Sequence, residues 1–116
     1  MMNEFEMSGP IATRRLQFRR TDGTVADVIV TVGKPVPDPR DPKRTWMCPL
    51  QIMGVGDEKV RPIFGADAMQ ALILGLHILP TILESLARSG HGSFVGDCRS
   101  DLGLTHACET QLGKKS

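Results

Sequence analysis

The chain has 116 residues, of which 41% are hydrophobic and 23% charged, and its formal net charge is +1. This length suits a single domain, and the near-neutral charge gives no general reason to expect a nucleic acid or a membrane surface as partner. Aromatic residues make up only 4% and tyrosine is absent, so stacking platforms for bases or sugars are not expected.

Cysteine usage and the N-terminal sequence both indicate a reducing compartment. Cys48, Cys98 and Cys108 are an odd number and are widely spaced, which predicts no disulfide framework. The first nine residues contain no apolar core of a secretory signal. The longest apolar stretch, residues 66–86, is interrupted by polar residues and a proline and is therefore not expected to span a membrane. We expect a cytoplasmic protein.

The chain is expected to begin with a flexible arm, residues 1–9. Residues 11–20 then predict a strand, because Leu16 and Phe18 alternate with polar residues at the period of a half-buried strand. The Asp-Gly pair at 22–23 is a strong hairpin signal, since glycine accepts the positive φ of a tight turn at no steric cost.

The second strand, residues 25–32, is rich in β-branched side chains and ends at Gly33. One of its faces carries Ala26, Val28, Val30 and Val32. A segment with four prolines follows over residues 34–44, which excludes a helix or a central strand. We expect an extended, semi-rigid loop with polyproline character. Pro37 and Pro39 are its candidate recognition residues, and a purely solvated loop is the alternative.

The third strand spans residues 45–53 and the fourth spans residues 59–64, with a glycine-containing turn between them. Pro49 removes a ladder donor in the middle of the third strand, so we expect a bulge or a sheet edge there. The fourth strand carries Pro62, and two proline-bearing strands side by side indicate the weaker edge of the sheet. One face of the third strand is apolar and is assigned to the core: Trp46, Cys48, Leu50 and Ile52.

A long helix is predicted from Asp67 to about Arg88. Asp67 can accept a hydrogen bond from a first-turn N–H group, and Gln70 can return one, in the manner of a capping box. Pro80 either kinks this helix or opens a second one at its first turn.

The first part of this helix is apolar nearly all round, which predicts burial on more than one side. One set of residues is assigned to the sheet: Ala68, Leu72, Leu76, Leu79, Leu83 and Leu86. Met69, Ile73 and Leu74 then need another cover, and His77 is placed at an interface or in packing. A second copy of the chain is the simplest cover; the alternative is that the C-terminal tail folds back.

Residues 89–116 are expected to form an irregular tail, with a short helical turn near residues 104–112. Four zinc-capable side chains lie in this tail, and their spacings match no usual paired zinc motif: His91, Cys98, His106 and Cys108. No glycine-rich phosphate loop is present, because the Gly-x-Gly at 54–56 precedes a strand rather than a helix. We therefore expect no catalytic residues, metal or cofactor.

Two segments resemble a bacterial family of small domains of unknown function, which share a Trp-x-Cys strand and a Gly-x-Asp-x-x-Gln-Ala-Leu helix start. In this chain they are residues 46–54 and 65–72. The resemblance spans residues 11–88 and implies a meander followed by a helix, without an established activity. Helix starts of this kind also occur in small bacterial immunity-type proteins that bind toxins, which is an analogy of fold alone.

The sequence thus predicts an α+β domain over residues 10–88, in which one long C-terminal helix packs on a four-stranded antiparallel meander. The leading functional hypothesis is a non-catalytic protein-interaction module, possibly immunity-like, that forms a homodimer. The residues assigned to partner binding are Met69, Ile73, Leu74, His77, Pro37 and Pro39.

Two alternatives belong to other classes of function. The first is a small enzyme or ligand-binding domain, with a pocket between sheet and helix that involves Cys48, Asp67, Gln70 or His77. The second is nucleic-acid binding through four arginines, Arg14, Arg15, Arg19 and Arg20. This second alternative is disfavoured because strand alternation places Arg15 and Arg19 on one face and the other two on the opposite face.

Overall fold

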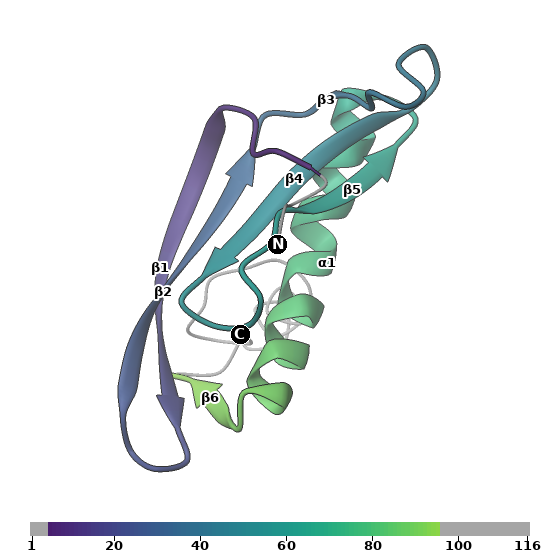
Figure 1. Ribbon diagram of the computed structural model, residues 1–116. Helices are drawn as coiled ribbons and strands as arrows, with labels where there is room; N and C mark the ends of the chain where they lie inside the picture. The colour runs from purple at the N-terminus through teal and green to yellow at the C-terminus, as the bar shows by residue number, and fades with distance from the viewer. Residues whose placement is uncertain (1–4, 96–116) are drawn as a thin grey trace, which may run out of the picture.

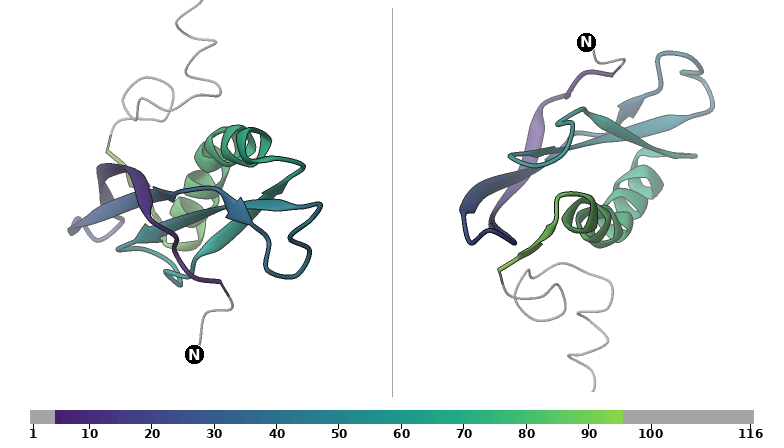
Figure 2. Two further views of the ribbon diagram at one scale, coloured as in Figure 1. Left: turned by 90° about the horizontal axis from the view of Figure 1, so that it is seen from above. Right: turned by 60° about the horizontal axis from the view of Figure 1, so that its bottom comes forward.

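The computed structural model describes residues 5–95, which form one antiparallel sheet and one helix (Figure 1). Helix α1 runs across one face of the sheet (Figure 2). The elements in chain order are β1 (Pro10–Arg20), β2 (Val25–Gly33), β3 (Val36–Pro37), β4 (Trp46–Met53), β5 (Arg61–Gly65), α1 (Ala68–Ser89) and β6 (Gly92–Phe94). The predicted α+β class with a C-terminal helix is confirmed.

The predicted number of four strands is wrong, because the described residues contain six. The meander β1–β2–β4–β5 is present, and β3 and β6 are added to it. Strand β3 lies on the same edge of β4 as β2, since β5 occupies the other edge. Val36 lies four positions after Val32, whereas their partners Met47 and Leu50 are only three positions apart. This one-residue register shift lies beside Pro49, which has no N–H group for the ladder. The irregularity expected at Pro49 is therefore present.

Strand β6 lies in the segment for which the sequence predicted no regular structure. It pairs antiparallel with the end of β1, in the register Phe18 to Phe94, and these two rings are 5.2 Å apart between centroids. A three-residue strand is too short to show a period, which explains why the pattern did not predict it. The expected irregular tail beyond Val95 and the helical turn near residues 104–112 lie outside the described residues.

The core lies between α1 and the facing side of the sheet. Alternation assigned the strand residues correctly: Leu16, Phe18, Val28, Val30, Val32, Cys48, Leu50 and Ile52 are all buried. The helix face was assigned only in part. Leu79, Leu83 and Leu86 are buried, but Leu76 is 36% exposed, while Ala71 and Gly75 pack against the sheet instead. Small residues at these positions let the helix backbone approach bulky strand side chains such as Leu50.

Pro80 neither divides α1 nor opens a second helix. The helix is continuous over Ala68–Ser89 and contains Pro80 as a buried residue. The missing N–H group of a proline costs one intrahelical hydrogen bond, and a helix supported by a core can carry that cost.

The opposite face of the sheet carries a smaller buried cluster around Met47 and Pro49. The described part of the N-terminal arm lies over it: a Cβ atom placed on Gly33 would be 2.6 Å from Met7 Sδ and 2.9 Å from Ser8 Oγ. Ser8 Oγ also donates a hydrogen bond of 2.6 Å to the carbonyl of Lys34. Residues 5–9 thus contact the sheet, and the flexibility expected for residues 1–9 stays a prediction.

The proline-rich loop differs from the extended form predicted for residues 34–44. Its second half is a compact, hydrogen-bonded turn, in which the Asp38 N–H donates to the carbonyl of Thr45 at 2.8 Å. Asp41 accepts from the Thr45 hydroxyl at 2.9 Å, and Asp38 accepts from the Arg40 N–H at 3.0 Å. Aspartate side chains that bond nearby backbone groups favour turns over polyproline structure.

Candidate functional site

The outward side of α1 exposes more large hydrophobic side chains than any other element of the described chain. Met69 is 70% exposed and Ile73 is 56% exposed, and Leu74 and Ile78 are exposed as well. The core holds the opposite side of the helix through residues such as Ala71, Leu79 and Leu83. The sheet therefore covers only one side of α1, as the excess of apolar residues predicted.

The exposed residues of α1 are arranged in stripes. Met69, Ile73 and Leu76 follow each other at spacings of four and three residues, the pattern of a seam between two packed helices. Leu74 and Ile78 lie on the other flank. Between the two flanks runs a more polar line that contains Gln70, His77, Thr81, Glu84 and Arg88. From residue 68 to residue 83, α1 contains no Asp, Glu, Lys or Arg.

The start of α1 is held by reciprocal side-chain hydrogen bonds. The Asp67 carboxylate accepts from the Gln70 N–H at 2.7 Å, and the Gln70 side-chain oxygen accepts from the Ala66 N–H at 2.6 Å. The second bond reaches one residue further back than a standard capping box. Asp67 thus satisfies a first-turn N–H group that has no intrahelical partner, and Gln70 ties the residue before the N-cap to the helix, so both side chains have a structural role.

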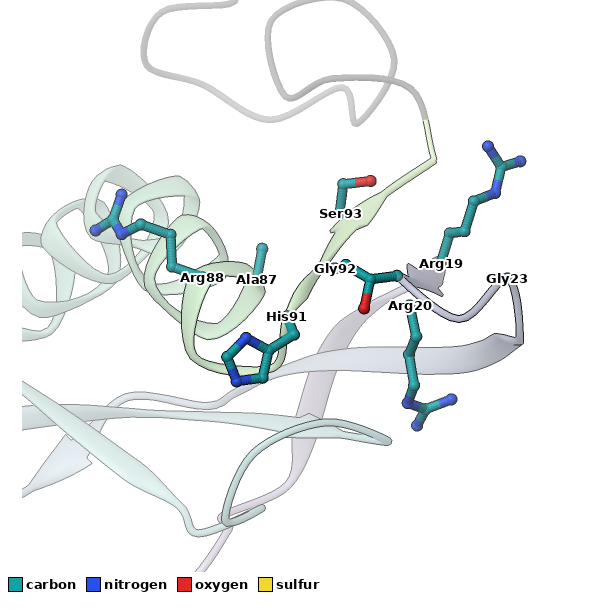
Figure 3. A pocket seen from close by; sticks show the side chains of 9 residues that line it. Arg19, Arg20, Gly23, Ala87, Arg88, His91, Gly92 and Ser93 are labelled. Carbon is teal, nitrogen blue, oxygen red and sulfur yellow. The ribbon is translucent and has the colours of Figure 1, made fainter.

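A second feature is an open groove of about 630 Å³ where the end of α1 meets the β1–β2 hairpin (Figure 3). Four basic side chains line it: Arg19, Arg20, Arg88 and His91, and none of its lining residues is acidic. Arg19 and Arg20 point to opposite sides of β1, and the Arg88 guanidinium points away from both (Figure 3). The three guanidinium groups therefore do not converge on one small anion.

The nucleic-acid site predicted from the sequence contained Arg14, Arg15, Arg19 and Arg20. Of these, only Arg19 and Arg20 line the groove. The other members, Arg88 and His91, come from the end of α1 and the turn after it. The turn places them there because the His91 carbonyl accepts a hydrogen bond of 3.0 Å from the Thr21 N–H. No local pattern in the sequence indicates this meeting, because it depends on β6 returning to β1.

Arg20 is partly neutralised by the hairpin beside it. Asp22 accepts hydrogen bonds from the Thr24 N–H at 2.9 Å and from the Thr24 hydroxyl at 2.7 Å. These bonds, with the nearby charge of Arg20, lower the pKa of Asp22 below its ordinary value, so its carboxylate stays charged over a wide pH range.

The structure does not bring together the residues proposed for a pocket between sheet and helix. Cys48 is fully buried beneath α1, where its thiol donates to the Gly33 carbonyl at 3.6 Å and burial raises its pKa. Asp67, Gln70 and His77 are exposed on α1 or at its start. A buried thiol with a raised pKa is a poor nucleophile, so Cys48 serves as a small core residue.

The residues assigned to partner binding fall on two faces of the molecule. Met69, Ile73, Leu74 and His77 are exposed on α1. Pro39 is exposed and lines a cavity of about 340 Å³ on the other face, together with residues 5–8, Val36 and Met47. Pro37 is exposed opposite Trp46, which packs against the core. Pro39 and the exposed residues of α1 therefore lie on different faces of the sheet.

Two further features of the described residues concern metal binding and membrane insertion. Within residues 5–95, no group of three or more His, Cys, Asp or Glu side chains could hold a metal ion. By length and composition alone α1 could cross a membrane, with a mean hydropathy of 1.5, although a core helix of a soluble protein meets the same criteria.

A family model described as "Domain of unknown function (DUF6968)" matches residues 12–106 of the chain. This match confirms the expectation of a small domain of unknown function, whereas the bacterial origin and the two motifs stay predictions. Comparison with curated proteins and with solved structures finds no match.

Proposed function

We propose that this chain, which belongs to the DUF6968 family of domains of unknown function, is a non-catalytic protein-interaction module that pairs with a second copy of itself through α1. The observation that carries the proposal is the outward side of α1. Met69 and Ile73 are more than half exposed there, on a stretch from residue 68 to residue 83 that has no charged side chain. A helix side that faces only water normally carries charged side chains over a stretch of this length.

The seam of Met69, Ile73 and Leu76 suits another helix as its occupant. Spacings of four and three residues place these side chains in one row along α1, and such rows fit between the side chains of a facing helix. A second copy of α1 offers the same row, which is the requirement of a two-fold interface.

Charge complementarity favours an antiparallel pair of α1 helices. When two such helices overlap over their full length, Asp67 at the start of one copy lies near Arg88 at the end of the other, at both ends of the pair. The helix dipoles also oppose each other in this arrangement. A parallel pair would instead place Asp67 near Asp67 and Arg88 near Arg88.

The size of the seam predicts a weak dimer. With 22 residues, α1 is about 33 Å long, and a strip about 10 Å wide offers on the order of 300 Å² per copy. Stable interfaces bury roughly 800 Å² per partner. Burial of these three partly exposed side chains on both copies contributes roughly 5–10 kcal/mol, which is comparable to an association cost of about 4–15 kcal/mol. We therefore expect dissociation at low protein concentration.

The test is sedimentation velocity over a wide range of protein concentrations. The unmodified chain should shift from monomer to dimer as concentration rises. Ile73→Glu places a charge in the seam and should keep the chain monomeric, whereas Ser85→Glu, on the far flank of the same helix, should dimerise as the unmodified chain does. A chain that is monomeric at every concentration, or an Ile73→Glu variant that still dimerises, would reject the proposal. Circular dichroism of each variant checks that α1 is intact.

A second candidate function is favoured by the basic groove. Arg19, Arg88 and His91 line it without an acidic neighbour among the lining residues, and their divergent directions suit separate phosphates along a nucleic-acid backbone. The test is titration of a 20-base-pair DNA duplex at 50 mM and 200 mM salt. Binding that weakens steeply with salt and is lost in Arg88→Ala would support this function; absence of binding at 50 mM salt would exclude it.

A further inference from the structure

The outer edge of β1 is paired over only part of its length. Strand β1 has 11 residues, and β6 pairs with only its last three, Phe18 to Arg20. One further bond joins the Val95 N–H to the Gln17 carbonyl at 2.9 Å. Among residues 5–95, no strand pairs with this edge before Gln17, and Figure 1 shows β1 at the border of the sheet with β6 beside its end only.

The register identifies which backbone groups point outward. The outer edge carries the Gln17 carbonyl, because Val95 bonds to it there. Backbone groups in a strand alternate between the two edges with a period of two. Arg15 and Thr13 therefore present their N–H and C=O groups to the same edge as Gln17, whereas Arg14 and Leu16 bond to β2. A row of such groups is a template for an added strand.

Strand β6 shows that this edge accepts a partner. It is only three residues long, yet it lies antiparallel and in register on β1. An extended segment that continues along the edge would make the same ladder bonds with Arg15 and Thr13. The side chains of that segment would alternate between the α1 side and the opposite face of the sheet.

The side chains along the edge select the partner by charge. The side chains of Arg15 and Arg19 are exposed on the face away from α1. The backbone N–H and C=O groups of both residues point to the outer edge of β1. A second copy of β1 that paired antiparallel about Arg15 would place the two Arg15 side chains opposite each other, which is unfavourable. A segment with acidic side chains opposite Arg15 would instead form favourable cross-strand pairs.

We propose that the outer edge of β1, from Thr13 to Gln17, binds an extended acidic segment of another protein by strand addition. The main-chain ladder supplies the affinity, and Arg15 supplies the preference for acidic side chains. This site is separate from the seam on α1, so it stands or falls independently of self-association.

The probe is a synthetic peptide of four Val-Glu repeats, with four Val-Lys repeats as its control. Alternation places every glutamate on one face and every valine on the other. Pairing with Arg15 should select the register in which the glutamates lie on the Arg15 face. The Val-Glu peptide should slow amide hydrogen exchange at Thr13 and Arg15, and the Val-Lys peptide should not. Arg15→Glu should weaken Val-Glu binding roughly fivefold or more and favour Val-Lys.

Thr13→Pro provides a second variant that is independent of charge. It removes one outward N–H group and no bond of the β1–β2 ladder, so the chain should fold and bind the Val-Glu peptide more weakly. The proposal would be overturned if neither peptide bound. It would also be overturned if Thr13 and Arg15 already exchanged slowly without peptide, since the edge would then be occupied by the chain itself or by a second copy.

Discussion

Two glycines show how single residues set the distance between α1 and the sheet. A Cβ atom on Gly65 would lie 2.5 Å from the Ala71 backbone nitrogen. The backbone fixes the position of Cβ, so every residue other than glycine would make this clash. A Cβ atom on Gly75 would lie 3.4 Å from Cys48 Sγ and 3.6 Å from Leu50 Cδ2, which are ordinary contacts. Gly65 is therefore required where the strand turns into the helix, whereas Gly75 can be replaced by a residue as small as alanine.

The matched variants Gly65→Ala and Gly75→Ala should have opposite effects on the free energy of unfolding. Gly65→Ala forces the backbone apart and should destabilise by about 1–3 kcal/mol. Gly75→Ala should be neutral or stabilising by up to about 1 kcal/mol, because alanine is the better helix former. Urea denaturation measures both. Equal destabilisation by the two would mean that α1 lies closer to β4 than the structure shows.

Asp38 should make stability depend on acid pH. The Arg40 N–H is the main cause that holds the pKa of this carboxyl below its ordinary value, and the Arg40 guanidinium adds to it. Such a group stabilises the fold above its unfolded pKa, and that contribution is lost as pH falls through the folded pKa. The unmodified chain should therefore be more stable than Asp38→Asn at pH 7, and the difference should shrink towards pH 3. A difference that stays constant with pH would contradict this account.

At the scale of elements, α1 is defined more by its ends and its packing than by propensity. Asp67 and Gln70 satisfy backbone N–H groups at its start, and the Gly90 N–H bonds to the Leu86 carbonyl at its end. Pro80 lies inside it without dividing it. The buried face, with Leu79 and Leu83, keeps the helix continuous through the proline because breaking it would expose the core.

Asp67→Ala should destabilise the chain by about 1 kcal/mol, since it leaves the Gln70 N–H without its acceptor. Asp67→Asn retains an oxygen acceptor at the same position and should stay within a few tenths of a kcal/mol of the unmodified chain. Thermal unfolding followed by circular dichroism distinguishes the two variants. If both lost the same stability, the carboxylate charge rather than the hydrogen bond would be the important feature.

At the scale of the whole molecule, the two ends of the described chain complete the sheet on different sides. The arm at residues 5–9 covers Met47 and Pro49 on the face away from α1. Phe5 packs edge-on against Phe64 with ring centroids 6.2 Å apart, and the Arg40 guanidinium lies 5.1 Å from the Phe5 ring centre. This small cluster joins the arm, β5 and the proline-rich loop.

A double-mutant cycle tests whether this cluster holds the arm to the sheet. Phe5→Ala and Phe64→Ala should each destabilise, and the double variant should lose less than the two single losses together. The expected coupling is about 0.5–1.5 kcal/mol, the range for an aromatic pair. Strictly additive effects, measured by urea denaturation, would show that Phe5 does not pack on Phe64 in solution.

The sequence by itself determined the features that depend on neighbouring residues. Alternation identified the buried faces of β1, β2 and β4, the Asp-Gly pair indicated the first hairpin, and Asp67 with Gln70 marked the start of α1. Each of these depends on chain geometry over a few residues, so a local pattern contains the information. The excess of apolar residues on α1 likewise predicted that the sheet would leave part of that helix exposed.

Only the tertiary structure decided the features that join distant segments. The rotation of α1 about its own axis decides that Gly75 is buried and Leu76 exposed, and this rotation depends on the shape of the sheet beneath the helix. The pairing of β6 with β1 brings Arg88 and His91 to Arg19 and leaves the rest of the β1 edge without a neighbour among the described residues. These meetings involve residues far apart in the chain, whose approach is driven by burial of the shared core rather than by any local preference.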